Sequence, residues 1–156
     1  MIKKLFFMII LLFFYSCFDE KYSSSIDSIA PLIEAKNLNG KKVYFDDEGL
    51  VVLVFFENGC SICIKELPLL NDFAKKNKVQ IIAINSVDDI KTIKNIKKNY
   101  NLNHIIFLKD ELDVSWYRYD IFALPTIIII KDGIIKDKII GNTNWQDLYQ
   151  KFASLL

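Results

Sequence analysis

The chain has 156 residues, 52% of them hydrophobic and 25% charged, and its 20 basic and 19 acidic side chains leave a formal net charge of +1. That length supports one domain with its own hydrophobic core. The balanced charge excludes the concentrated positive potential on which nucleic-acid binding depends, so no nucleic-acid partner is expected.

Residues 1–16 are typical of a secretion signal. Lys3 and Lys4 supply positive charge, and residues 5–15 form an apolar stretch of eleven residues. This stretch is too short for a transmembrane helix, which needs about 20 apolar residues. The mature protein is therefore expected to be exported, with 18 basic and 19 acidic side chains left after removal of the two lysines.

Cys17 directly follows the small residue Ser16, and residues 14–17 resemble the end of a bacterial lipoprotein signal. In such signals the cysteine is lipid-modified and becomes the new N-terminus, so Cys17 is the predicted lipidation site. The polar, serine-containing stretch that follows predicts a flexible tether over residues 17–29, with the folded domain over residues 30–156. The alternative is an ordinary signal in which Cys17 has no role.

Turn signals and apolar runs indicate the first elements of the domain. Two strand-like runs flank Asn39-Gly40, a strong hairpin signal. Residues 51–56 are continuously apolar, as in a parallel strand that is buried on both faces. A helix is predicted over residues 61–77, with a kink at Pro68. The central elements that follow are a strand over 80–85, a helix over 88–100 capped by Asp88, a strand over 105–108 and a short helix over 111–117.

The last elements form an antiparallel edge and a closing helix. Residues 126–131 and 134–140, split by Asp132-Gly133, predict a second hairpin. Residues 144–155 predict an amphipathic helix whose apolar side consists of Trp145, Leu148, Tyr149 and Phe152. An order that combines alternating strands and helices with antiparallel hairpins predicts an α/β fold with one central mixed sheet.

The candidate site is Cys60-Ser61-Ile62-Cys63, placed where the apolar strand ends and the first helix begins. The unpaired N–H groups and the dipole at a helix start favour an anion, and the thiolate is the reactive form of cysteine. Cys63 lies about one turn after Cys60 and can close a disulfide with it. If Cys17 carries a lipid, this pair accounts for all three cysteines. The pattern predicts a reversible dithiol.

Two other uses of the cysteine pair compete with redox chemistry. One pair and a single histidine, His104, cannot supply the usual four ligands of a structural zinc site, and no metal or cofactor is expected. A purely structural disulfide across four residues would close a very small loop and stabilise the fold little. His104 begins a strand far along the chain and is expected to be structural. The aromatic residues expected in the core or at its rim are Trp116, Tyr117 and Tyr119.

Taken together, these motifs resemble the thioredoxin superfamily, in its exported TlpA/ResA-like thiol–disulfide oxidoreductase branch. The resemblance covers the domain from Ala30 onward. It implies a three-layer α/β sandwich with an N-terminal β-hairpin and an inserted strand–helix unit at about residues 80–100. The stretches that carry it are Ala30-Pro31-Leu32, Gly40-Lys41-Lys42-Val43, Val52-Leu53-Val54-Phe55-Phe56, Cys60 to Pro68, Tyr119, Leu124-Pro125-Thr126 and Asp132-Gly133.

The resemblance implies roles for five residues. Cys60 is expected to be the attacking thiolate and Cys63 the resolving thiol. Pro125 matches the cis-proline that faces the dithiol, and the backbone of Leu124 is expected to pair with substrate; the alternative is a proline at a strand start. Glu66 matches an acidic residue near the dithiol, which would exchange a proton with Cys63. The alternative for Glu66 is a solvated helix carboxylate.

The chain departs from the superfamily pattern at three places. Val54 stands where plain thioredoxin has a buried Asp, which leaves Glu66 as the candidate for proton transfer and Glu57 as a distant second. Gly59 replaces the Trp that usually precedes the first cysteine, and Ser61-Ile62 does not end in proline. Both changes are expected to alter the thiol pKa and the reduction potential, in a direction that the residues alone do not give.

The sequence thus predicts an extracytoplasmic, membrane-tethered thiol–disulfide oxidoreductase that reduces disulfides in envelope proteins or apocytochromes c. Its expected partners are disulfide-containing client proteins, a membrane thiol transporter as electron donor, and a bacterial membrane reached through the N-terminal lipid. A monomer facing the periplasm or the exterior is expected. Two alternatives stay open: a non-catalytic thioredoxin-fold surface lipoprotein that binds partners, and a dithiol oxidase.

Overall fold

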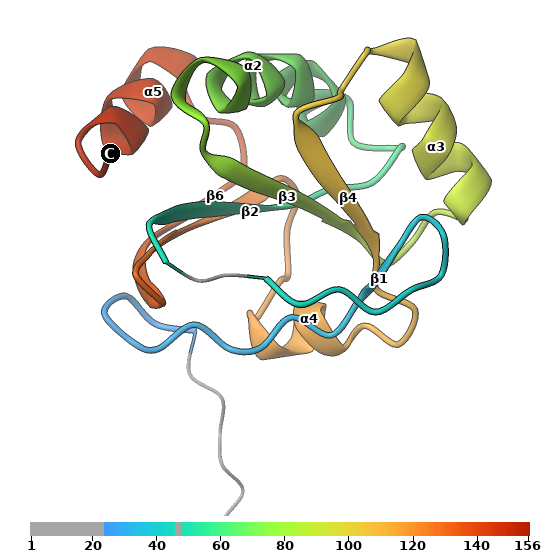
Figure 1. Ribbon diagram of the computed structural model, residues 1–156, viewed down its shortest axis with the longest axis horizontal. Coiled ribbons are helices and arrows are strands. Elements are labelled where there is room, and N and C mark those ends of the chain that lie inside the picture. The colour runs from blue at the N-terminus through green and yellow to red at the C-terminus, as the bar shows by residue number, and fades with distance from the viewer. Residues whose placement is uncertain (1–23, 46–47) are drawn as a thin grey trace, which may run out of the picture.

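The computed structural model describes residues 24–45 and 48–156, and its centre is a mixed β-sheet. The strands are β1 (Lys36–Asn37), β2 (Leu50–Phe55), β3 (Gln80–Asn85), β4 (Ile105–Lys109), β5 (Thr126–Lys131) and β6 (Ile134–Ile140). They lie in the order β1-β4-β3-β2-β5-β6 (Figure 1). Strands β2, β3 and β4 are parallel, whereas β1, β5 and β6 each pair antiparallel with their neighbours. The predicted central mixed sheet is therefore confirmed.

Helices cover both faces of this sheet and complete the predicted three-layer sandwich. On one face lie α2 (Ser61–Asn77), α3 (Ile90–Asn99) and α5 (Trp145–Ala153). The short helix α4 (Val114–Arg118) lies on the other face together with the N-terminal segment (Figure 1). The inserted strand–helix unit is β3 followed by α3.

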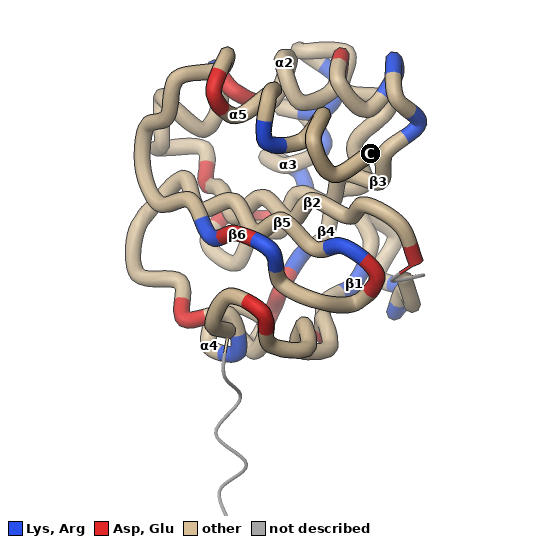
Figure 2. The backbone as a smooth tube through the Cα atoms, turned by 90° about the vertical axis from the view of Figure 1, so that its left-hand side faces the viewer, with Lys and Arg blue, Asp and Glu red and all other residues tan. Residues whose placement is uncertain are grey.

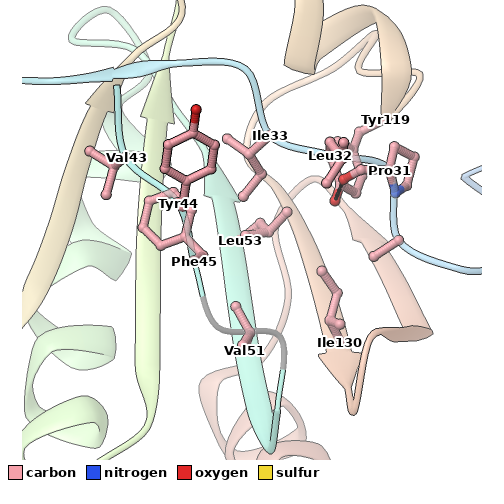
Figure 3. A pocket seen from close by; sticks show the side chains of 11 residues that line it. Pro31, Leu32, Ile33, Val43, Tyr44, Phe45, Val51, Leu53, Tyr119 and Ile130 are labelled. Atoms are coloured by element: carbon pink, nitrogen blue, oxygen red, sulfur yellow. Dashed lines mark hydrogen bonds between the residues drawn. The ribbon is translucent and has the colours of Figure 1, made fainter. Parts of the chain in front are cut away.

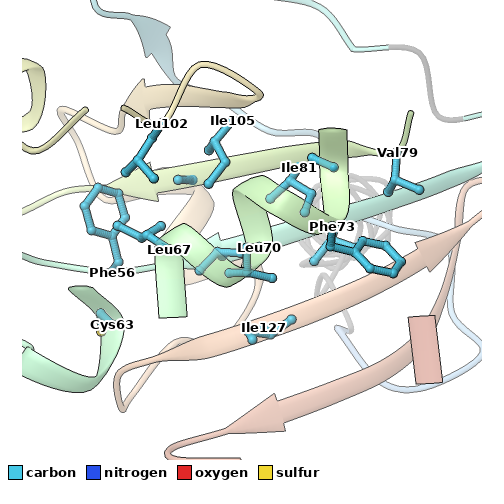
Figure 4. Close-up of a cluster of buried hydrophobic side chains, with 14 of the residues drawn as sticks. Phe56, Cys63, Leu67, Leu70, Phe73, Val79, Ile81, Leu102, Ile105 and Ile127 are labelled. Carbon is cyan, nitrogen blue, oxygen red and sulfur yellow. The ribbon is translucent and has the colours of Figure 1, made fainter. Parts of the chain in front are cut away.

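Alternation of side chains along β2 divides the core into two clusters. Val52 and Val54 belong to the cluster under α2, α3 and α5, and Val51 and Leu53 belong to the cluster on the α4 face. All six residues of β2 are buried, which explains the continuous apolar run. Figure 4 shows the first cluster, in which Cys63 lies beside large apolar side chains of the sheet and α2.

Strongly periodic segments have the predicted bounds. The helix over 61–77 and the strands over 80–85, 126–131 and 134–140 match, and Pro68 lies inside α2 without dividing it. The predicted N-terminal hairpin is short: Lys36 and Lys42 form an antiparallel bridge across the turn, and the Asn37 N–H donates to the carbonyl of Lys41 at 2.8 Å. Gly40 in this turn has φ +78°, which glycine adopts at no steric cost.

Two helix starts differ from the prediction because other carboxylates cap them. The helix predicted over 88–100 begins at Ile90, and its cap is Asp89, whose carboxylate accepts from the Thr92 N–H at 2.7 Å; Asp88 as cap is wrong. The helix predicted over 111–117 is α4. The fully buried Asp110 carboxylate fixes its start by accepting from the N–H groups of Val114, Ser115 and Trp116.

Residues 24–29 belong to the folded domain, whereas composition predicted a flexible tether there. Ser24 is 4% exposed, the Asp27 N–H donates to the carbonyl of Ile135 at 2.7 Å, and Ile29 forms a bridge with Ile134. This segment therefore lies along β6, a long-range pairing that local polarity does not reveal. The predicted signal peptide, the remainder of the predicted tether and Cys17 lie outside the described residues.

Charged residues of both signs are interspersed over the surface. Figure 2 shows this on β6, where Lys136 and Lys138 flank Asp137, while the neighbouring β5 is largely uncharged. The Lys151 ammonium of α5 forms an ion pair with the Asp137 carboxylate. Within residues 24–45 and 48–156, none of the helices has the length and apolar character needed to cross a membrane.

Candidate active site

The dithiol lies at the start of α2, with its two cysteines differently exposed. Cys60 is the N-cap of the helix and is half-buried, whereas Cys63 is fully buried. The two form a disulfide, with their Cα atoms 5.2 Å apart. The sulfur of Cys60 accepts from the Cys63 N–H at 3.2 Å. Cys60 is thus the more accessible of the two cysteines, and the N-terminus of a helix is a position that favours a thiolate in the reduced state.

A polar network holds the loop that carries Cys60. The Asn58 N–H donates to the Asp88 carboxylate at 2.7 Å, and the side-chain amide of Asn85 donates to the same oxygen at 2.7 Å. The Asp88 N–H in turn donates to the side-chain oxygen of Asn85 at 2.8 Å. Asn85 is fully buried. Sequence reasoning missed this network, although a buried Asn at the end of an apolar strand is a usable signal because such a group needs partners.

Pro125 lies at the same end of the sheet as the dithiol. Its neighbour Thr126 pairs with Phe55, the last residue of β2, from which the dithiol loop departs. The Leu124–Pro125 peptide bond is cis, as the resemblance implied. Leu124 and Cys60 both pack against the apolar cluster under α2. The loop that precedes β5 is thus placed beside the dithiol.

Glu66 lies one turn after Cys63 on the buried side of α2. It is 8% exposed, which excludes the solvated helix carboxylate. Burial raises the pKa of Glu66 to about 7, against a smaller lowering by the Thr143 N–H, which donates to the carboxylate. Its Oε2 atom is shielded from solvent and has no hydrogen-bond partner within the described residues. A buried carboxylate that titrates near neutrality is suited to proton transfer.

The loop between β6 and α5 connects two parts of the site and was missed by sequence reasoning. The Gly141 N–H donates to the carbonyl of Pro125 at 2.8 Å. Two residues later, the Thr143 N–H donates a hydrogen bond to the Glu66 carboxylate. Backbone donors leave no side-chain signature, so no sequence motif could have identified Thr143.

Of the remaining candidate residues, Val54 and His104 take no part in the chemistry at the dithiol, and Gly59 directly precedes Cys60. Val54 is fully buried in the core and carries no proton. His104 is exposed and precedes β4, at the end of the parallel strands opposite to the dithiol; its N–H donates to the Asn71 side chain at 2.9 Å. A Cβ on Gly59 would meet Glu57 Oε1, the end of a flexible side chain, at 3.4 Å, so the backbone there does not exclude a residue with a Cβ. No group of three His, Cys, Asp or Glu residues positioned for a metal occurs in the described part of the chain.

A cavity of about 310 Å³ lies on the opposite side of the sheet (Figure 3). Val51 and Leu53 of β2 form part of its lining, and both side chains lie on the α4 face of the sheet, whereas Cys63 belongs to the cluster on the other face. The Tyr119 hydroxyl, also in the lining, donates to the carbonyl of Pro31 at 2.6 Å, and burial raises the Tyr119 pKa. The cavity is largely apolar and is separate from the dithiol site.

Comparison with known proteins agrees with this geometry. Residues 26–138 match the AhpC/TSA family. A thiol-disulfide oxidoreductase ResA of Bacillus cereus is 32% identical over 138 residues, which cover 84% of this chain and 79% of that protein. The ResA of Bacillus subtilis (strain 168) is 28% identical over 145 residues, which cover 89% of this chain and 80% of that protein.

Solved structures share the fold. A secreted Mycobacterium tuberculosis disulfide oxidoreductase homologous to E. coli DsbE superposes with a TM-score of 0.69 at 25% identity, covering 78% of this chain and 94% of that one. A putative thiol:disulfide interchange protein DsbE from Chlorobium tepidum superposes with a TM-score of 0.77 at 18% identity, covering 85% and 99%. With Cys60 and Cys63 joined at the start of α2, the chain belongs to the AhpC/TSA family and, within its thioredoxin fold, to the ResA-type thiol–disulfide oxidoreductases.

Proposed function

We propose that this chain is a membrane-tethered enzyme outside the cytoplasm that reduces disulfides in envelope proteins, apocytochromes c among them. The observation that carries the proposal is the unequal exposure of the two sulfur-bearing residues. Cys60 is accessible at the helix N-terminus, and Cys63 is fully buried behind it. Such asymmetry supports one cysteine that meets the client and one that resolves the complex.

In this mechanism the Cys60 thiolate attacks one sulfur of the client disulfide. A Cys60–client disulfide forms, and the second client sulfur leaves as a thiolate. Cys63 then attacks Cys60 as a thiolate, which breaks the mixed disulfide and releases the first client sulfur as a thiolate too. Two electrons pass to the client, and the enzyme is left with the Cys60–Cys63 disulfide. We assign Glu66 the role of accepting the Cys63 proton, and the backbone of Leu124 and Pro125 the role of binding the client chain.

The direction of electron flow is tested by the reduction potential of the Cys60–Cys63 couple. Because the compartment outside the cytoplasm is oxidising, a reductase must be supplied with electrons, here by a membrane thiol transporter. Equilibration of the purified protein with glutathione or dithiothreitol buffers should give a potential below about −220 mV, in the range of reducing thioredoxin-type proteins. A potential near about −120 mV, as in a strong oxidant, would instead assign the chain to dithiol oxidation.

The tether is tested by the variant Cys17→Ala in the full-length chain. Loss of the lipid attachment site should move the protein from the membrane fraction to the soluble fraction, because one lipid-modified residue is the proposed anchor. The measurement is fractionation of cells followed by immunodetection. Ser23→Ala, in the same segment, should fractionate like the wild type. A Cys17→Ala protein that stays in the membrane fraction would refute the lipid anchor.

A further inference from the structure

A groove of about 630 Å³ lies beside the carboxyl ends of the parallel strands, between the turn after β3 and the segment around α4. Its apolar lining is largely exposed: Tyr117 is 82%, Phe122 77% and Val87 61% exposed. Three exposed apolar side chains around one hollow are unusual on a monomer surface and are typical of a binding site. We call this hollow the aromatic groove, defined by Val87, Asp113, Trp116, Tyr117, Asp120 and Phe122.

Two connections place the aromatic groove near the dithiol site. Val87 directly precedes Asp88, whose carboxylate holds the Asn58 N–H, two residues before Cys60. On the other wall, Phe122 is three residues before Pro125, and three residues of extended chain span at most about 10 Å. A client segment that reaches Cys60 along the cis-proline loop therefore passes close to the aromatic groove.

The lining also indicates the chemistry of the occupant. The Trp116 ring packs edge-on against Phe55 with the ring centres 6.0 Å apart, so a rigid aromatic surface forms part of the wall. The ionisable side chains of the lining, apart from Tyr117, are Asp113 and Asp120. The Asp120 carboxylate accepts a hydrogen bond from the Ser24 hydroxyl at 3.1 Å and lies near the Lys138 ammonium. Asp113 makes no hydrogen bond or ion pair through its carboxylate within the described residues, and so leaves a negative charge at the rim.

We propose that the aromatic groove binds a large apolar side chain of the client, close in sequence to the client's cysteine, together with a neighbouring basic residue that Asp113 attracts. The inference rests on the proposed function, because the client is the polypeptide whose disulfide Cys60 opens. When the client's cysteine approaches Cys60, the neighbouring segment meets the groove at a high effective concentration, so a modest anchor suffices to favour the attack on such clients. Aromatic side chains suit this role because they bury a large area at a small entropic cost.

The test uses nine-residue peptides with a central cysteine in a mixed disulfide with 5-thio-2-nitrobenzoate, whose release is followed by absorbance. One peptide carries Phe and Lys within three residues of the cysteine, and its counterpart carries Ala and Glu. For each enzyme variant, the kcat/KM for each peptide is divided by the kcat/KM of the same variant for a small symmetric disulfide. We expect the Phe–Lys peptide to be favoured at least tenfold by the wild type, and the preference to fall to less than threefold in Tyr117→Ser/Phe122→Ser.

Tyr44→Ser is the matched control, because Tyr44 is a 92% exposed tyrosine that lines the separate cavity next to Val51 and Leu53 and not the aromatic groove. It should keep the wild-type preference. Asp113→Asn should reduce the difference in normalised kcat/KM between peptides that carry Lys and peptides that carry Glu. A wild type without preference, or a double variant that keeps it, would overturn the groove as a client site.

A binding measurement separates failure of the groove from failure of the chemistry. Peptides with Ser in place of cysteine cannot exchange electrons, and their affinity is followed by tryptophan fluorescence in a Trp145→Phe background, which leaves Trp116 as the reporter. Tighter binding of the Phe–Lys peptide by at least tenfold supports the groove even if no disulfide is reduced. Equal binding of both peptides contradicts it, whatever the reductase activity.

Discussion

Replacing Cys60 by serine should lower the reduction of a protein disulfide such as that of insulin by at least about a thousandfold, because the attacking group is lost. Cys60 is the cysteine at the helix N-cap that is open to solvent, and Cys63 has no access of its own. A serine hydroxyl is not ionised at neutral pH and cannot form a disulfide. The measurement is the turbidity of insulin in the presence of a thiol donor, with the melting temperature as the check on folding.

The matched variant is Cys63→Ser, which should fail in a different way. With Cys60 intact, the first attack proceeds and the mixed disulfide accumulates, because the resolving thiol is missing. Non-reducing electrophoresis and mass spectrometry should therefore detect an enzyme–client adduct in Cys63→Ser and none in Cys60→Ser. A Cys60→Ser protein that reduced insulin at the wild-type rate would contradict this mechanism.

Segments with a strong local pattern could be predicted well from the sequence. The helix after Cys60 and the strand over 80–85 have the predicted bounds because amphipathic or continuous apolar periodicity is encoded within each segment. The position of the dithiol at the end of a buried strand followed from the same pattern. The resemblance to thioredoxin-like proteins supplied what periodicity could not, namely Pro125 beside the dithiol.

Features set by contacts between distant segments could not be predicted. The start of α4 depends on the buried Asp110 carboxylate, and the ordering of residues 24–29 depends on pairing with β6. A polar, serine-rich segment has the same composition whether it is solvated or paired. The environment of Glu66 was open for this reason too, because its carboxylate accepts from the N–H of Thr143, which lies 77 residues further along the chain.

Glu66 should give the folded protein a specific pH dependence. Because burial raises its pKa from 4.5 to about 7, the folded state binds a proton that the unfolded state has released between these two values. The free energy of unfolding should therefore fall as the pH rises from about 4.5 to 7, by at most about 3 kcal/mol from this group. Above pH 7 the buried carboxylate is charged, and this loss of stability should be complete. Glu66→Gln removes this dependence and should be more stable than the wild type at pH 8, as measured by urea unfolding.

The same substitution tests the proposed proton transfer. If the Glu66 carboxylate accepts the Cys63 proton, Glu66→Gln should lose the inflection near pH 7 in the rate of mixed-disulfide resolution, because glutamine does not titrate. Glu57→Gln, in the loop before Cys60, is the control and should keep the inflection. An unchanged pH profile in Glu66→Gln would remove Glu66 from the mechanism and leave it as a buried structural carboxyl.

The variant Thr143→Pro should change the Glu66 pKa without altering the carboxylate itself, and Thr143→Ala is its control. The Thr143 N–H lowers this pKa by donating to the charged form, so Thr143→Pro, which has no N–H, should raise the pKa further above 7. Thr143→Ala keeps the N–H and should leave the pKa at about 7. Carbon-13 NMR of labelled glutamate side chains measures the shift directly. If the mechanism holds, the inflection in the resolution rate should move to higher pH by the same amount in Thr143→Pro. An inflection that stays in place while the NMR pKa moves would show that another group takes the proton.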